Sequence, residues 1–270
     1  MDKIKNTLVI VRGGGDIASG IIQKLYRVGF KILILEVNTP SSIRRKVCFS
    51  EAIYDGNAVV EGIRSTFCKS EEEIKKTWEE NTIPVVIDTK GEYIEKLKPQ
   101  IVVDAILAKK NIGTTIDMAP LVIGVGPGFY ATKDCDLVVE TMRGHNLGQI
   151  IFQGSALKNT GVPGKIKGYD KERVIYSENC GKIKNIKEIG DIVKKGDVIA
   201  QIGENKVLAT IDGVLRGLIR DGYEVSEKFK IADIDPRIEE QKNCFTISDK
   251  ARAIGGAVLE GIFIRRDLWS

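Results

Sequence analysis

The chain has a single histidine, His145, among its 270 residues. A metal site built on several imidazoles and a relay between two histidines are therefore both excluded. The five cysteines are odd in number, widely spaced and without a Cys-x-x-Cys pair; they are Cys48, Cys68, Cys135, Cys180 and Cys244. This spacing argues against a disulfide framework or a zinc knuckle and favours reduced thiols. We expect no metal site.

Long apolar runs are also missing. No segment approaches the roughly 20 apolar residues of a membrane span, and the start of the sequence, MDKIKNTLVIV, lacks a signal-peptide pattern. We therefore expect a cytoplasmic protein that does not bind membranes. The 41 basic and 37 acidic residues give a net charge of +4 without a basic tract, so nucleic acid is not an expected partner.

What is present is an alternation of two kinds of segment. Apolar runs typical of strands lie at residues 7–12, 31–35, 85–88, 101–105 and 121–124, and helical spacing is found at 17–28, 70–80, 92–97 and 248–264. This alternation predicts an α/β fold with a Rossmann-like parallel sheet covered by helices. Ligands of such sheets bind beyond the carboxyl ends of the strands.

The stretch TLVIVRGGGDIASG, residues 7–20, contains the most specific motif. It places G-x-G-x-x-A between a strand and a helix, which is the fingerprint of dinucleotide binding. The tight turn, the close approach to a pyrophosphate and the free N–H groups of the helix start give the candidate contacts Gly13, Gly14, Gly15, Asp16, Ile17 and Ala18. Asp16 would repel phosphate, so we interpret it as the N-cap of the helix. The alternative is a glycine-rich turn that binds nothing.

Three further groups extend this candidate cofactor site. Glu36 ends the next strand, where an acid would hold a ribose hydroxyl. Arg44 and Arg45 could bind a phosphate, which would favour NADP over NAD, or could be a solvated pair. A second glycine-rich loop clears side chains from one face at Gly124, Gly126 and Gly128, and its alternative is a rigid surface turn.

A polar segment between two β-like runs supplies the candidate catalytic residues. Glu140, Arg143 and His145 lie within one turn and could hold an anion or perform acid–base work. The alternative for His145 is an ordinary surface residue. Cys135 lies between two aspartates, which predicts a raised thiol pKa and a structural thiol.

An internal repeat follows. Residues 181–203 align without gaps on residues 213–235, at an offset of 32 residues, so that Gly190 matches Gly222 and Val193 matches Val225. Two such halves, joined by a hairpin at residues 203–206, predict an all-β barrel-sandwich module of the lipoyl and biotinyl type. Lys206 lacks the sequence setting of a modified lysine, so no covalent lipoyl or biotin group is expected.

These patterns predict four parts. They are a Rossmann-like nucleotide-binding domain (1–130), a middle β-containing segment with the VVETMRGH cluster (131–172), the barrel-sandwich module (173–238), and a carboxyl-terminal helix and tail (239–270).

Five stretches together resemble one family. They are RGGGDIASG (12–20), SIRRKVCFSEAIYDG (42–56), GVGPGFYATKDCDLVVETMRGHNLG (124–148), NTGVPG (159–164) and DKARAIGGAVLEGI (249–262). The set resembles the YqeB-type accessory proteins of selenium-dependent molybdenum hydroxylase systems. The resemblance implies a maturation factor that acts with a hydroxylase apoenzyme or with selenium-supply proteins.

The function predicted from sequence is therefore an accessory protein that binds a nucleotide or a phosphate-bearing, molybdopterin-type cofactor. An NAD(P)-dependent oxidoreductase is one alternative, with NAD or NADP as cofactor. A non-catalytic binding scaffold is another. The sequence leaves open the bound ligand, the selenium donor, whether any reaction is catalysed and whether the chain forms a homo-oligomer.

Overall fold

The computed structural model describes residues 2–161 and 164–265. It consists of two compact units, described separately below. Unit 1 comprises Met1–Pro40, Cys48–Asn159 and Ile247–Ser270, and unit 2 comprises Ser41–Val47 and Thr160–Thr246. The boundary expected at residue 130 falls inside unit 1, and the segment expected at 239–270 is divided between the two units at Thr246.

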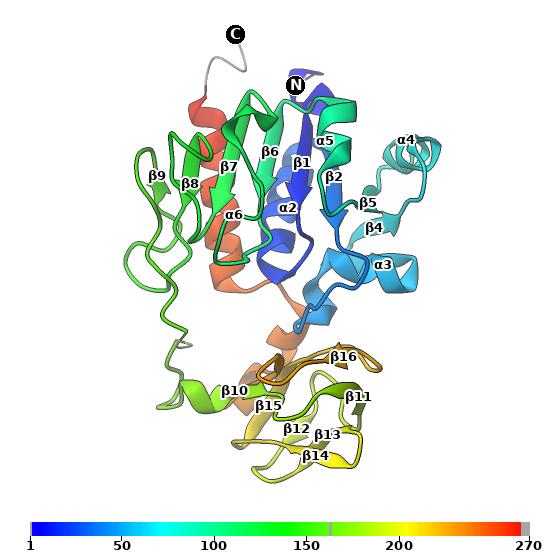
Figure 1. Ribbon diagram of the computed structural model, residues 1–270, viewed down its shortest axis with the longest axis vertical. Helices are drawn as coiled ribbons and strands as arrows, with labels where there is room; N and C mark the ends of the chain where they lie inside the picture. Colours follow the sequence, from blue (N-terminus) through cyan, green and yellow to red (C-terminus); the bar gives the residue numbers. More distant parts are fainter. Residues whose placement is uncertain (1, 162–163, 266–270) are drawn as a thin grey trace. The chain divides into compact units, whose positions relative to one another are not determined.

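Unit 1 is built on a nine-stranded sheet, seen from one side in Figure 1. In spatial order its strands are β3 (Asn57–Val60), β4 (Ile63–Phe67), β5 (Ile83–Ile87), β2 (Lys31–Glu36), β1 (Leu8–Arg12), β6 (Ile101–Asp104), β7 (Leu121–Val125), β8 (Leu137–Val139) and β9 (Ile150–Ile151). The seven strands from β4 to β8 pair in parallel, and the outer strands β3 and β9 pair antiparallel to their neighbours. The expected mixed α/β fold with a largely parallel sheet is confirmed.

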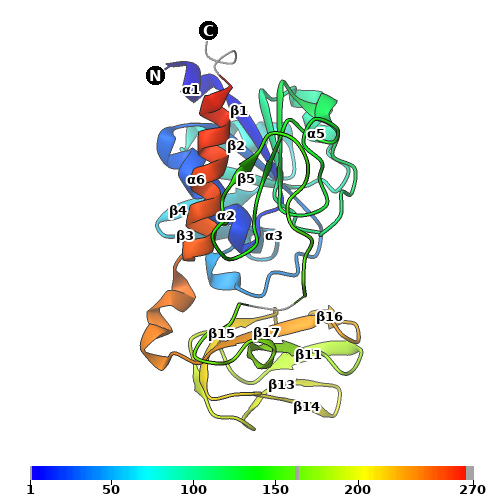
Figure 2. The ribbon, with the colours of Figure 1, turned by 90° about the vertical axis from the view of Figure 1, so that its left-hand side faces the viewer.

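The central strands are mostly apolar, as expected for strands with both faces of the sheet covered. All five residues of β1 and of β7 are buried. Helices α2 (Asp16–Val28) and α6 (Asp249–Ile264) lie side by side on one face, and α5 (Glu92–Leu97) lies on the other (Figure 2). The remaining helices are α1 (Asp2–Asn6), α3 (Ala52–Asp55) and α4 (Glu71–Glu79).

Two helix starts are capped by serine hydroxyls. The Ser70 hydroxyl accepts a hydrogen bond from the Glu73 N–H (3.3 Å) at the start of α4. The Ser248 hydroxyl accepts one from the Ala251 N–H (3.1 Å) at the start of α6. Both helices therefore begin on a serine that caps a first-turn N–H group.

Unit 2 contains two four-stranded antiparallel sheets, ordered β10-β17-β15-β12 and β14-β13-β11-β16. The strands are β10 (Val174–Tyr176), β11 (Gly181–Asn185), β12 (Ile192–Val193), β13 (Val198–Ile202), β14 (Asn205–Leu208), β15 (Gly213–Leu218), β16 (Glu224–Val225) and β17 (Lys230–Asp235). The two repeats exchange their short strands, since β12 pairs with β15 of the second repeat and β16 pairs with β11 of the first. Each repeat therefore completes the sheet of the other around one apolar core.

The turns of the two repeats explain their matching glycines. Gly190 and Gly222 both have positive φ, +103° and +75°, in the turn before the short strand. Glycine adopts this backbone conformation without a steric penalty. The expected hairpin is confirmed as a two-residue turn at Gly203 and Glu204, between β13 and β14.

Candidate functional site

The first glycine of the 13–15 loop is required by the backbone. Gly13 has φ +94°, and a Cβ atom at this position would lie 3.1 Å from the Ala105 carbonyl oxygen. Its N–H donates to the Leu35 carbonyl (2.8 Å). The loop therefore makes the expected tight turn and lies against the segment that follows β6.

Gly14 is used by the protein itself. A Cβ atom here would lie 2.9 Å from the Ser50 nitrogen, and the Gly14 carbonyl accepts hydrogen bonds from the Ser50 N–H (3.0 Å) and the Ser19 hydroxyl (3.2 Å). Gly14 is buried beneath the short helix Phe49–Glu51. The prediction that Gly14 contacts a cofactor is corrected here, because protein atoms cover this face of the glycine.

The start of α2 remains partly exposed. Its N-cap is Gly15, in an extended conformation (φ −67°, ψ −174°), and Asp16 is the first helical residue. The expectation that Asp16 caps the helix is therefore wrong. Gly15 and Asp16 are half-exposed, whereas Ile17 and Ala18 are buried against the sheet, where only their backbone N–H groups could serve an anion.

Glu36 lies at the end of β2, as expected, with its carboxylate against the glycine loop. Oε1 accepts from the Gly14 N–H (2.7 Å) and Oε2 from the Val37 N–H (2.8 Å). Burial raises the pKa of Glu36, and these two hydrogen bonds act in the opposite direction. The Glu36 carboxylate therefore holds the glycine loop in shape. It does so at the position where a ribose was predicted to bind.

The second glycine loop owes its glycines to close packing. Cβ atoms would lie 2.5 Å from the Phe129 ring at Gly124, 2.8 Å from the Thr141 hydroxyl at Gly126, and 2.6 Å from the Lys110 Cα at Gly128. Protein atoms thus lie at the positions where these glycines lack a side chain. This corrects the predicted cofactor contacts at Gly124 and Gly126, which are buried under Phe129 and Thr141. Gly128 is exposed, so its contact with a ligand stays a prediction.

Glu140, Arg143 and His145 are close in sequence but have different surroundings in the structure. The Glu140 side chain, 2% exposed, accepts hydrogen bonds from three backbone N–H groups, those of Thr141 (2.6 Å), Met142 (2.6 Å) and Leu157 (2.8 Å). A carboxylate held this way organises loops, which corrects its predicted catalytic role.

Arg143 and His145 lie in the exposed turn that follows. Both guanidinium Nη atoms donate to the Asp249 carboxylate at the start of α6, at 2.9 and 3.0 Å. His145 is exposed on the same turn. The structure therefore joins Arg143 to α6, and it does not bring Glu140 and His145 together as an acid–base pair.

Lys250, which the sequence analysis did not identify, interacts with Asp16 at the start of α2. It is half-buried in the first turn of α6 and interacts electrostatically with Asp16, Arg143, Glu140 and Asp249. Burial lowers the pKa of Lys250, and the carboxylates act against that shift. Its place in the closing DKARAIGG stretch is the signal that could have revealed it.

The sequence analysis also did not identify a buried polar cluster between the ends of β1 and β6, where the strand order reverses. The Arg12 guanidinium forms an ion pair with the Asp104 carboxylate (3.1 Å), and the Thr114 hydroxyl bonds to both side chains. Each of the three residues is at most 3% exposed. They fasten the β6–β7 loop over the carboxyl ends of β1 and β6.

The two arginines predicted to bind phosphate belong to unit 2. Arg44 is 6% exposed and donates to the backbone carbonyls of Asn243 and Thr246, both at 3.0 Å. Arg45 donates to the Leu218 carbonyl (2.7 Å). These contacts correct the predicted phosphate-binding role, because both guanidinium groups hold backbone of their own unit.

The cysteines are free thiols, and only Cys180 is exposed. Burial raises the pKa of the Cys135 thiol to about 12, with smaller contributions in the same direction from Asp134 and Asp136. The raised pKa expected from sequence is confirmed, although burial contributes most. Within residues 2–161 and 164–265, no group of three or more His, Cys, Asp or Glu side chains is placed to hold a metal ion.

Comparison with known proteins gives one strong match. The chain is 50% identical over 257 residues to the uncharacterized protein YqeB of Escherichia coli strain K12, across 95% of this chain and 47% of that protein. The chain is thus similar to YqeB along nearly all of its own length. The chain spans about half the length of its YqeB relative. No protein-family model matches the chain.

Solved structures are only distantly similar to this chain. TcdA (CsdL) is 12% identical with a TM-score of 0.30, covering 97% of this chain and 90% of that one. A succinylglutamate desuccinylase from Silicibacter sp. TM1040 is 13% identical with a TM-score of 0.26, covering 84% of each chain. The product-bound ectoine utilization protein EutE (DoeB) from Ruegeria pomeroyi is 11% identical with a TM-score of 0.25, covering 77% of this chain and 58% of that one. Similarity this low carries no functional conclusion.

Among the residues that the structure describes, no helix has both the length and the apolar character to cross a membrane.

Proposed function

We propose that unit 1 binds the phosphate-bearing part of a nucleotide or of a molybdopterin-type cofactor at the carboxyl edge of its sheet. The observation that carries this proposal is the start of α2 at Gly15, a half-exposed glycine that follows β1. A 13-residue helix that begins on glycine offers its first-turn N–H groups and the positive end of its dipole to an anion.

The strand order supports a Rossmann-type interpretation. The succession β5-β2-β1-β6-β7-β8 corresponds to the order 3-2-1-4-5-6 of doubly wound dinucleotide-binding sheets. In those sheets the ligand lies where the strand order reverses, which here is between β1 and β6. Gly15 follows β1 at that point, and Glu36 ends β2, the neighbour of β1 on its other side.

Cationic groups near the start of α2 suit the same ligand. Helices α2 and α6 run in the same direction, because Gly20 lies against Ala251 and Gly255 lies against Gly20 and Lys24. Both helix starts therefore face the carboxyl edge, with Lys250 close to Asp16. Lys250 would bind a phosphate oxygen, and Asp16 would hold the ammonium group in place.

A molybdopterin-type cofactor fits this donor set. Its metal is bound by its own dithiolene, so the chain needs to hold only phosphate and pterin. The backbone N–H groups at residues 15–17 and the Lys250 ammonium would bind the phosphate end. When bound, such a group supplies the redox chemistry of a hydroxylase, and the residues of this chain serve to bind and orient it.

The biological role within this proposal is maturation of selenium-dependent molybdenum hydroxylases. Its support is the set of YqeB-type motifs together with the 50% identity to YqeB. The expected partners are a hydroxylase apoenzyme or proteins that supply selenium. Unit 2, interpreted as a barrel-sandwich module by its exchanged short strands, would provide a docking domain without a covalent cofactor on the exposed Lys206.

Thermal-shift measurements with NAD, NADP, GMP and a pterin phosphate test the binding proposal. A ligand at 100 times its Kd stabilises the folded state by about 2.7 kcal/mol, which raises the melting temperature measurably. The decisive variant is Gly15→Asp. The extended φ and ψ of Gly15 accept any residue, and aspartate is a favoured N-cap, so the fold should survive. Its carboxylate would occupy the anion position and abolish the shift.

Ser70→Asp is the matched control, because it places the same side chain at the N-cap of α4. This variant should keep the full ligand-induced shift. The proposed site is wrong if no ligand raises the melting temperature of the unaltered protein, or if every ligand that does so raises the melting temperature of Gly15→Asp as strongly.

A further inference from the structure

Unit 1 contains a cavity of about 550 Å³ on the β7 side of the sheet's carboxyl edge. Three loops line it: the β6–β7 loop with Lys109, the β7–β8 loop from Pro127 to Asp134, and the segment after β9. Its volume falls in the range of roughly 300–1,000 Å³ that small-molecule sites occupy. None of the residues predicted to be catalytic lines it.

The walls of the cavity are held together by specific contacts. The Ala131 N–H donates to the Gly154 carbonyl (2.7 Å), which joins the β7–β8 loop to the segment after β9. Glu140 accepts a hydrogen bond from the Leu157 N–H (2.8 Å), which fixes the segment after β9 at a second point. Gly128 lies directly against the Lys110 backbone. The cavity is therefore formed before any ligand binds.

Unusual backbone conformations occur in two of these loops. Leu107, Lys109 and Thr132 have φ values of 60°, 64° and 77°, in the left-handed region that non-glycine residues rarely adopt. Strained residues persist where surrounding contacts impose them, and they cluster at ligand-binding sites. Two of the three strained residues belong to the loop that carries Lys109.

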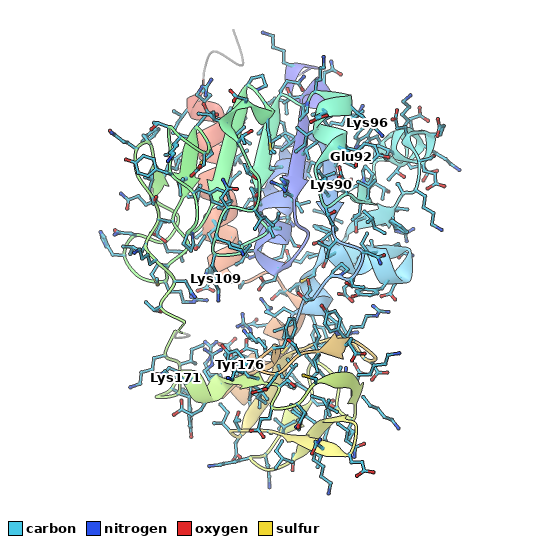
Figure 3. The ribbon with its side chains drawn as sticks, viewed as in Figure 1. Lys90, Glu92, Lys96, Lys109, Lys171 and Tyr176 are labelled. Atoms are coloured by element: carbon cyan, nitrogen blue, oxygen red, sulfur yellow. The ribbon has the colours of Figure 1, made fainter. Side chains whose placement is uncertain are left out.

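The lining combines a flat surface with positive charge. The Tyr130 side chain, 43% exposed, and Pro127 provide an apolar wall. Lys109 and Lys158 supply two ammonium groups from different loops, and Figure 3 labels Lys109 at the carboxyl edge of the sheet. The one carboxylate of the lining, Asp134, accepts a hydrogen bond from the Tyr130 N–H (2.8 Å). The cavity thus carries an excess of positive charge.

We infer that this cavity is a second small-molecule site, separate from the start of α2, for a flat molecule that carries a phosphate or carboxylate group. Lys109 and Lys158 bind the anionic group, and the Tyr130 ring stacks on the flat part of the ligand. The hydroxyl of Ser155 and the amide of Asn159 provide hydrogen bonds at its rim. This inference does not depend on the function proposed above.

Titration calorimetry on the full chain tests it with three probes, GMP, 2-naphthoate and ribose 5-phosphate. We expect GMP, 2-naphthoate or both to bind, and the difference between them identifies phosphate or carboxylate as the anion. Lys109→Ala and Lys158→Ala should each weaken that binding about tenfold, as expected for one lost charged hydrogen bond. Lys110→Ala is the matched control, because Lys110 is the exposed neighbour that does not line the cavity, and it should bind normally.

Two variants probe the flat wall and the space. Tyr130→Ala should weaken the flat probes while leaving ribose 5-phosphate unchanged. Ser155→Trp, at an exposed loop position, should fill the cavity and block all binding. Ribose 5-phosphate that binds as tightly as GMP would overturn the stacking role of Tyr130.

The outcomes separate this site from the start of α2. Binding that survives Gly15→Asp but is lost in the Lys109→Ala, Lys158→Ala double variant supports the inference. It is overturned if neither flat probe binds at millimolar concentration, or if their binding is lost in Gly15→Asp and retained in the double lysine variant.

Discussion

At the scale of single residues, Glu140 holds two backbone segments of unit 1 in place through three N–H groups. Its carboxylate accepts N–H groups from the turn at residues 141–142 and from Leu157, and it is almost fully buried. Buried acceptors of this kind matter mainly through what is lost when they are removed, since the donors are then left without partners.

We expect Glu140→Gln to lower the free energy of unfolding by roughly 2–4 kcal/mol, because one amide oxygen cannot replace two charged carboxylate oxygens. Urea denaturation measures this change. The control is Glu204→Gln in the exposed turn between β13 and β14, which should change stability by less than about 0.5 kcal/mol. Equal stability of the two variants would show that Glu140 is dispensable for the fold.

Lys250 gives a prediction about pH. Its pKa in the folded protein is lowered from the ordinary 10.5 mainly by burial, against the opposing effect of Asp16, Glu140 and Asp249, while Arg143 reinforces the lowering. Between the lowered folded pKa and 10.5, the unfolded chain binds more protons at this residue than the folded chain does. Stability contributed by this group should therefore rise with pH through that window.

The measurement is the unfolding free energy of the unaltered protein and of Lys250→Met between pH 7 and pH 10.5. As pH increases, the unfolding free energy of the unaltered protein should rise relative to that of Lys250→Met, because only the unaltered protein carries the titrating ammonium. A difference that stays constant across this range would contradict the burial of Lys250.

At the scale of elements, the packing of α2 against α6 depends on small residues. Cβ atoms at Gly20 and Gly255 would each lie 2.5 Å from a backbone carbonyl oxygen of the other helix. Because the two helices approach this closely, Lys250 comes near the start of α2. The geometry of the candidate site is therefore a consequence of helix packing.

Gly255 and its neighbour Gly256 form a matched pair for testing this packing. Gly255→Ala should destabilise the protein by about 1–3 kcal/mol, because the added methyl group forces the helices apart. Gly256→Ala meets nothing within 4 Å and should stabilise α6 by about 0.5–1 kcal/mol, since alanine is the better helix former. Thermal unfolding distinguishes the two signs, and a common sign would refute the close approach.

At the scale of the whole molecule, each unit has its own apolar core. In unit 2 the core is shared by the two repeats, because each short strand pairs with the opposite repeat. Val193 of β12 and Val225 of β16 occupy equivalent positions and are both almost fully buried. Neither repeat could close this core by itself.

Val193→Ala and Val225→Ala should therefore destabilise unit 2 by similar amounts, about 1–3 kcal/mol each. Hydrogen exchange read by mass spectrometry should show faster exchange across β10–β17 in both variants, with both repeats affected. Faster exchange confined to the repeat that carries the substitution would contradict the strand exchange.

Local patterns were sufficient to predict the elements that shape the candidate site. The apolar run before the glycines forms β1, the spacing after them forms α2, and Ser248 caps α6, since each depends on residues a few positions apart. The repeat likewise showed its hairpin and its matched turns. Glu36 was correctly placed at the end of β2 for the same reason.

Contacts between residues far apart in the sequence determine what individual residues bind. Gly14, Gly124 and Gly126 were predicted to face a ligand, yet Ser50, Phe129 and Thr141 lie where their Cβ atoms would be. Arg44 and Arg45 were predicted to bind phosphate, yet they donate hydrogen bonds to backbone carbonyl groups of unit 2. No local pattern reports which distant segment will pack on a bare backbone.

By itself, the sequence determined the alternation of strands and helices, the glycine turn into α2 and the paired repeats, because periodicity and capping act over a few residues. Only the tertiary structure decided that Arg143 meets Asp249 across 106 residues of chain, that Lys250 lies near α2, and that three loops enclose a cavity. Such contacts depend on how closely helices and loops pack, which is set by the shape of the whole core.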